Sequence, residues 1–97
     1  MEKLYNSKGQ VAVAISPEYG AGWSTWSDVN PMDKRYNQLI LDGDIQAAIE
    51  LAEAENHDSF GLTDCYIEWL DPGTRFTVEE YNGYESIRTL VDLQYTT

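Results

Sequence analysis

The chain has few of the features that mark an extracellular, membrane-spanning or metal-binding protein. It holds one cysteine, Cys65, so no internal disulfide can form, and we expect a reducing, cytoplasmic compartment. No apolar run approaches the roughly 20 residues of a membrane-spanning helix, and the opening Met-Glu-Lys is not typical of a signal peptide. No cysteine–histidine cluster has zinc-site spacing, and the acids lack the spacing of a calcium loop. We therefore expect neither a metal nor another cofactor.

Basic residues are also scarce, and they are unevenly placed. Six Lys and Arg stand against seventeen Asp and Glu, which gives a net charge of −11. Residues 1–41 are balanced, whereas residues 42–97 contain only Arg75 and Arg88 as bases and carry the whole net charge. Binding to a nucleic-acid backbone needs clustered Lys and Arg, so direct binding to nucleic acid is not expected. A basic protein partner, or solubility alone, would account for the charge.

Length and pattern predict a single domain, residues 1–97, of the α+β class: a small, mainly antiparallel β-sheet with a helix pair on one face. The segment 10–17 is rich in β-formers and ends at a proline. Its alternate positions place valine and isoleucine on one face and the small residues Ala12 and Ala14 on the other. We expect a central or near-central strand against which a helix lies closely.

Two consecutive helices are predicted after this strand, and the first spans residues 30–43. Asn30 suits the N-cap, Pro31 the first helical position and Asp33 the third, where its charge favours the positive end of the helix dipole. Gly43 then ends this helix.

The second helix, residues 45–56, follows at once, with Asp44 as its N-cap. Its apolar face is predicted to pack inward, and its opposite face is acidic. The two helices together form a corner with six carboxylates in or beside it. These candidate partner-binding residues are Asp42, Asp44, Glu50, Glu53, Glu55 and Asp58. A solvated helix face is one interpretation of them, and an anionic patch recognised by a basic groove is the other; the lack of interleaved lysines favours the second.

The residue pattern in the last third of the chain predicts β-structure. A strand over 65–70 is followed by Asp-Pro-Gly-Thr, which is typical of a type II turn. Asn82-Gly83 is a strong hairpin signal and pairs Tyr81 with Tyr84 and Glu80 with Glu85. We expect a strand to about Thr89 and then a short tail of undetermined form.

Two features of these strands have both a structural and a chemical interpretation. The facing carboxylates of Glu80 and Glu85 repel, and we interpret them as a solvated hairpin tip rather than a cation or proton site. Cys65 lies in an apolar strand context, which predicts a small buried side chain rather than a nucleophile.

The run YGAGWSTW, residues 19–26, raises three possibilities: a ligand loop, a catalytic elbow or a hydrophobic plug. Thr25 stands where a dinucleotide-binding motif needs its third glycine, and Trp26 replaces the closing glycine of a nucleophile elbow. We therefore expect a glycine-hinged loop that folds a tryptophan over the sheet. The alternative is a contact loop in which Tyr19, Trp23 and Trp26 meet a partner.

Two segments resemble small uncharacterised proteins of bacteriophages and prophages. They are VAVAISPEYGAGWS, with a Tyr-Gly-x-Gly loop after a strand, and the hairpin FTVEEYNGYESI, and together they cover about a quarter of the chain. The resemblance implies an accessory protein of the anti-defence type that acts in the host cytoplasm. Anti-CRISPR and anti-restriction proteins of this size are frequently acidic mimics of DNA.

These observations together predict a non-enzymatic inhibitor. Its acidic surface would occupy the basic site of a host nucleic-acid-binding defence protein, such as a nuclease or CRISPR-type effector. The alternative is a small-ligand binder, for instance a sponge for a nucleotide signal, that uses the glycine- and tryptophan-rich loop.

Overall fold

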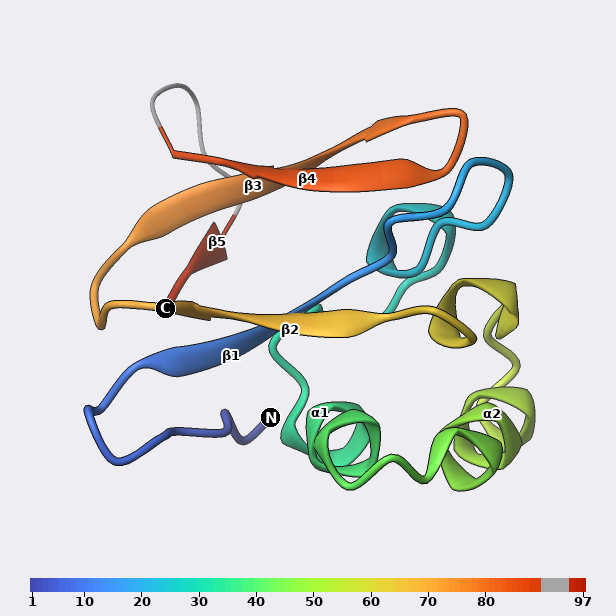
Figure 1. Ribbon diagram of the computed structural model, residues 1–97, viewed down its shortest axis with the longest axis horizontal. Coiled ribbons are helices and arrows are strands. Elements are labelled where there is room, and N and C mark those ends of the chain that lie inside the picture. The colour runs from blue at the N-terminus through green and yellow to red at the C-terminus, as the bar shows by residue number, and fades with distance from the viewer. Residues whose placement is uncertain (90–94) are drawn as a thin grey trace.

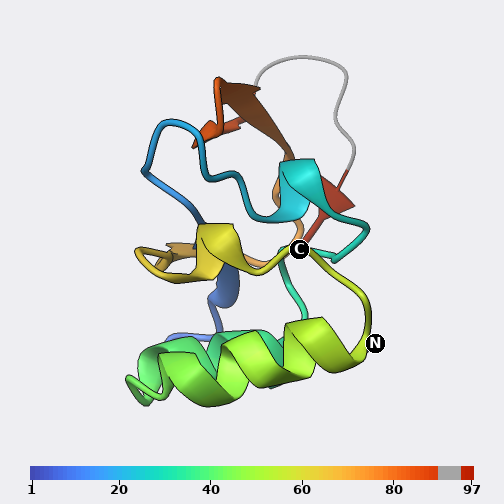
Figure 2. The same ribbon diagram turned by 90° about the vertical axis from the view of Figure 1, so that its right-hand side faces the viewer.

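A computed structural model of the chain describes residues 1–89 and 95–97 and shows an α+β fold with two small antiparallel sheets. Figure 1 shows three layers: a helix pair, the β1–β2 sheet in the middle, and the β3–β4 hairpin with β5 on the far side. Figure 2 shows the same order of layers from the side. The elements are β1 (Val11–Ile15), η1 (a 3-10 helix, Ser24–Trp26), α1 (Lys34–Leu41), α2 (Ile45–Ala54), η2 (a 3-10 helix, Phe60–Leu62), β2 (Tyr66–Leu70), β3 (Arg75–Tyr81), β4 (Tyr84–Arg88) and β5 (Tyr95–Thr96).

Strand β1 is buried along its whole length and separates two apolar clusters. Its Val11, Val13 and Ile15 pack toward β3, while Ala14 packs among side chains of the helix pair. The small side chains let α1 approach, so that Asn37 Nδ2 donates to the carbonyl of Ala12 at 3.1 Å. The prediction that a helix lies close to this strand is confirmed.

Helix α1 starts later than predicted, so the assignment of Asn30 as the N-cap and Pro31 as the first helical residue is wrong. Asp33 is the N-cap, and its carboxylate accepts from the backbone N–H of Arg35 at 3.0 Å. The carbonyl of Pro31 instead accepts from the N–H of Ala14 at 2.9 Å, and Asn30 accepts from the N–H of Met32. The segment before α1 is therefore bonded to β1 and to its own turn, which leaves the helix to begin at Lys34.

Helix α2 follows the prediction more closely. Asp44 accepts from the N–H of Ala47 at 3.2 Å, and Gly43 has the positive φ of 75° that the tight corner requires. Ala48 and Ala52 are fully buried against α1 and β1. None of the helices in the described residues is long and apolar enough to span a membrane.

The hairpin has the predicted register, with Tyr81 opposite Tyr84, Glu80 opposite Glu85 and Val78 opposite Ile87. Asn82 and Gly83 both have positive φ, 49° and 90°, as a type I′ turn requires. Strand β4 ends at Arg88, one residue before the predicted end. The predicted tail lies mostly in residues 90–94, outside the described residues, but Tyr95 and Thr96 pair with β3 as β5.

Candidate functional site

The glycine- and tryptophan-rich loop is held against the hairpin by one carboxylate, that of Glu85. Its Oε1 accepts from the N–H of Ser16 at 2.9 Å, and its Oε2 accepts from the N–H groups of Trp23 and Thr25 at 2.9 and 3.0 Å. The hydroxyl of Thr25 donates to the same Oε2 at 2.6 Å. Glu85 is 2% exposed, so these donors replace the water that the carboxylate loses on burial.

The interpretation of Glu80 and Glu85 as a solvated hairpin tip is therefore wrong for Glu85. The carboxylate of Glu85 is buried and accepts hydrogen bonds from the loop, whereas the side chain of Glu80 stays exposed to solvent. The backbone fits closely as well: a Cβ on Gly83 would lie 2.5 Å from the backbone nitrogen of Ala21. Glycine at position 83 thus serves both the turn and the close approach of the loop.

This closure favours the hydrophobic plug among the three possibilities for the loop. Trp23 is fully buried and lies edge-on to Tyr36, with ring centroids 5.0 Å apart. Trp23 is a core residue, so the predicted contact loop keeps only Tyr19 and Trp26 at the surface, 67% and 41% exposed. The amides that would have met a nucleotide phosphate are already bonded to Glu85.

The described residues do not bring Ser24, the serine of the loop, together with His57. Ser24 is buried and its hydroxyl makes no hydrogen bond, and His57 is not bonded to it. The described His, Cys, Asp and Glu residues include no group of three placed to hold a metal ion.

The predicted acidic residues fall into two groups. Four of them, which we call the acidic corner, are exposed around the α1–α2 junction and along α2, and none is ion-paired with a Lys or Arg of the described chain; they are Asp42, Asp44, Glu50 and Glu53. Their local bonds are to neutral groups, such as the amide of Gln38 on Asp42. The acidic corner is therefore a surface of uncompensated charge.

Glu55 and Asp58 belong to the second group, because each has a structural bond. Glu55 accepts two bonds from the Arg35 guanidinium, at 2.7 and 3.1 Å, and one from the Tyr36 hydroxyl at 2.6 Å. These bonds join the end of α2 to the start of α1. Asp58 accepts from the backbone N–H of Phe60 at the start of η2.

The contacts of Glu55 predict a specific acid sensitivity. The hydrogen bond from Arg35, and then that from Tyr36, hold the pKa of Glu55 below its ordinary value of 4.5. A carboxylate whose pKa falls on folding stabilises the fold above its unfolded pKa, and that stabilisation is lost as the pH drops through the lower folded pKa. Unfolding by urea at about pH 7 and about pH 3 should show that Glu55→Gln is less stable than wild type at the higher pH, with the difference shrinking at the lower one. A difference that stays constant or grows on acidification would contradict this assignment.

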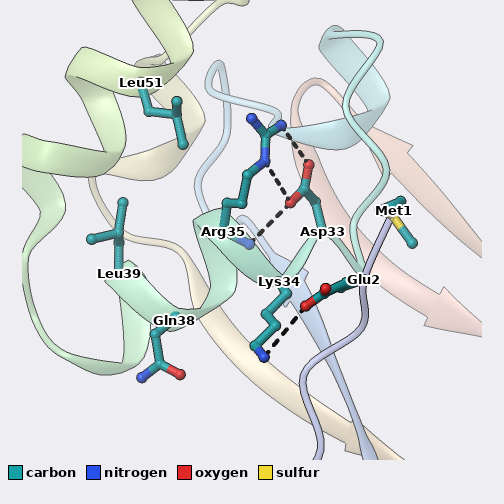
Figure 3. A pocket seen from close by; sticks show the side chains of 8 residues that line it. All are labelled: Met1, Glu2, Asp33, Lys34, Arg35, Gln38, Leu39 and Leu51. Atoms are coloured by element: carbon teal, nitrogen blue, oxygen red, sulfur yellow. Dashed lines mark hydrogen bonds and ion pairs between the residues drawn. The ribbon is translucent and has the colours of Figure 1, made fainter.

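A hollow of about 870 Å³ opens beside the helix pair, and Figure 3 shows its lining. Leu39 of α1 and Leu51 of α2 give it apolar walls. The two cations at its rim are already paired, Arg35 with Asp33 and Lys34 with Glu2. The hollow thus offers apolar surface, and one of its lining residues, Gln38, donates a hydrogen bond to Asp42 of the acidic corner.

Cys65 is predicted not to take part in any activity. It lies just before β2, is half-buried rather than fully buried as predicted, and packs against the cluster between β1 and the helices. Burial raises the pKa of its thiol, which disfavours the reactive thiolate. Cys65→Ala should lower the free energy of unfolding by about 1 kcal/mol and leave function unchanged. The folded protein should react slowly with a thiol reagent and the urea-unfolded protein quickly; fast labelling of the folded chain would refute the buried-thiol interpretation.

The sequence analysis missed a surface group of three tyrosines, Tyr19, Tyr81 and Tyr84, which we call the tyrosine patch. Tyr81 and Tyr84 are cross-strand neighbours beside the turn, which the Asn82-Gly83 signal already implied. Tyr19 stacks on Tyr84 with ring centroids 5.2 Å apart, and no local pattern in the sequence shows that.

Comparison of the chain with protein families, curated proteins and solved structures found no match.

Proposed function

We propose that this protein is a non-enzymatic inhibitor that binds the basic, nucleic-acid-binding site of a host defence protein through its acidic corner. The observation that carries the proposal is the set of exposed carboxylates with no ion-paired Lys or Arg in the described chain: Asp42, Asp44, Glu50 and Glu53. A surface that only needs solubility usually mixes both signs of charge. Uncompensated acids attract a basic groove and speed its association, because opposite fields steer the encounter.

The hollow beside the acidic corner supplies what charge alone lacks. Exposed charge pairs contribute little affinity, since water and salt screen them. Apolar side chains of the partner that enter the hollow would bury the exposed parts of Leu39 and Leu51. The partner that fits is therefore a basic surface that also presents an apolar residue, as a groove that binds nucleic acid commonly does.

The choice of a defence protein, such as a nuclease or CRISPR-type effector, is supported by the resemblance of two segments to phage accessory proteins. Such an inhibitor acts in the host cytoplasm.

The test is a capture experiment that includes competition by DNA. The tagged full-length chain is incubated with bacterial lysate, and bound protein is eluted with increasing salt or with duplex DNA. The proposal expects a nucleic-acid-binding protein that is released by both, because the acidic corner and DNA occupy the same site. A captured protein that resists both salt and DNA would overturn it.

The alternative, a sponge for a nucleotide signal at the glycine- and tryptophan-rich loop, has weaker support. The N–H groups of Trp23 and Thr25 are bonded to Glu85, and the ring of Trp23 is buried, so neither is free to meet a ligand. A nucleotide that copurifies with the intact chain, identified by mass spectrometry, would favour this alternative over the inhibitor.

A further inference from the structure

The tyrosine patch is a second surface with the composition of a protein contact; its residues come from the β3–β4 hairpin, which lies away from the helix layer in Figures 1 and 2, and from the loop bonded to that hairpin. Tyr19, Tyr81 and Tyr84 are 67%, 71% and 42% exposed, although the ring of Tyr19 lies against both of the others. Tyr19 stacks on Tyr84 and meets the edge of Tyr81, with centroids 6.3 Å apart in the second pair. Large aromatic side chains grouped in solvent are typical of binding hot spots.

The patch is organised before any partner arrives. Tyr19 belongs to the loop that Glu85 holds, and the neighbouring Gly20 donates its N–H to the carbonyl of Asn82 in the hairpin turn. The other two rings stand on paired strands at positions fixed by the turn. A partner would therefore lose little free energy to ordering these side chains.

Two of these rings also line a shallow hollow with carboxylates at its edge. The hollow measures about 410 Å³ and is lined by Glu79, Glu80, Tyr81, Tyr84 and Ser86. Glu79 projects on the same face of the hairpin as the two rings; its Oε1 pairs with Arg88, and its Oε2 accepts no hydrogen bond from the described residues. Glu80 projects on the opposite face, toward the loop, where its Oε2 accepts from the N–H of Gly83 at 2.8 Å and from the indole N–H of Trp26 at 3.4 Å.

We propose that the tyrosine patch binds an arginine side chain of a protein partner. A guanidinium stacks flat on a tyrosine ring and forms hydrogen bonds to a carboxylate with its edge, and this hollow presents both groups together. The Arg88–Glu79 pair shows that the same strand pair accommodates one guanidinium beside a carboxylate. The inference is independent of the acidic corner, which needs only a basic surface of opposite charge.

The probe is a short acetylated and amidated Gly-Arg-Gly-Arg-Gly peptide, titrated into the full-length chain and followed by NMR. Its control replaces both arginines with citrulline, which keeps the shape and removes the charge. The arginine peptide should shift the ring resonances of Tyr19, Tyr81 and Tyr84, and the citrulline peptide should bind several-fold more weakly. Tyr81→Ala should lower the affinity about two- to fivefold, as expected for the loss of one exposed cation–π contact.

Matched variants separate this surface from general effects. Tyr81→Phe should retain binding because its ring remains, and Tyr5→Ala should change nothing, since Tyr5 is 57% exposed and lies outside the patch. The amide resonances of Val78 and Ile87 report whether each variant keeps the hairpin. The proposal is overturned if the citrulline peptide binds equally well, if the shifts map only to the acidic corner, or if a folded Tyr81→Ala binds normally. Because the readout is at the patch, a chain with the acidic corner neutralised should still bind the peptide, whichever way the inhibitor proposal turns out.

Discussion

Glu85→Ala should lower the free energy of unfolding by about 4 kcal/mol, because Glu85 is a buried acceptor of several hydrogen bonds. The substitution leaves the N–H groups of Ser16, Trp23 and Thr25 without their buried acceptor. Each unsatisfied buried donor costs about 1–3 kcal/mol, and relaxation of the loop toward water recovers part of the sum. A domain of this size has only about 5–15 kcal/mol in total, so the variant should lose a large fraction of its stability. Urea or guanidinium denaturation measures the change.

Two further variants separate the causes of this loss. Glu85→Gln keeps the shape and one acceptor oxygen but turns an N–H₂ group toward N–H donors, so we expect about half the effect, roughly 2 kcal/mol. Glu18→Ala removes an exposed carboxylate near the same loop and should stay within about 0.5 kcal/mol of wild type. If Glu85→Ala has the same midpoint denaturant concentration of unfolding as the wild type, the carboxylate does not hold the loop in solution.

The role of Glu85 shows where reasoning from the sequence reaches its limit. The hairpin register was predictable, because Asn82-Gly83 favours a two-residue turn and fixes which residues face each other. The register correctly placed Glu80 opposite Glu85, but whether a carboxylate faces water or donors depends on what packs there. The donors come from the loop around Trp23, more than sixty residues away in the chain. No periodicity or local propensity encodes such a contact.

The prediction of where α1 starts failed for the same physical reason. Asn30, Pro31 and Asp33 form a good local signal for a helix that starts at Pro31, with Asp33 inside its first turn. The carbonyl of Pro31 instead accepts a hydrogen bond from Ala14, which is a tertiary contact, and Asp33 becomes the N-cap. By contrast, Asp44 and Gly43 were predictable because their corner is closed by bonds within a few residues.

The candidate site was predictable in part. The excess of acids after residue 41 is visible in the sequence, and so is its helical location. Only the structure shows that Glu55 is neutralised by Arg35 whereas Glu50 and Glu53 are not. Of the three candidate contact residues in the loop, it places Trp23 in the core and leaves Tyr19 and Trp26 exposed.

The second large effect concerns the acidic corner. A variant with Asp42→Asn, Asp44→Asn, Glu50→Gln and Glu53→Gln should bind its captured partner roughly 10- to 100-fold more weakly at low salt, mainly through slower association. The fold should persist, because the four side chains are exposed and asparagine at position 44 can still cap α2. Stopped-flow or surface-plasmon measurements give the association rates, and the wild-type rate should fall toward that of the variant as salt rises.

A control variant with the same change of net charge decides whether the location matters. It carries Glu18→Gln, Asp28→Asn, Asp64→Asn and Asp71→Asn, all exposed positions outside the acidic corner. If the acidic corner is the contact, this control should lose only the small, long-range part of the attraction, because the field of a distant charge is screened within about 10 Å at 0.1 M salt. Equal losses in both variants would mean that net charge alone steers the partner. Normal binding by the corner variant together with loss of binding by a folded Tyr81→Ala would move the partner's contact from the acidic corner to the tyrosine patch.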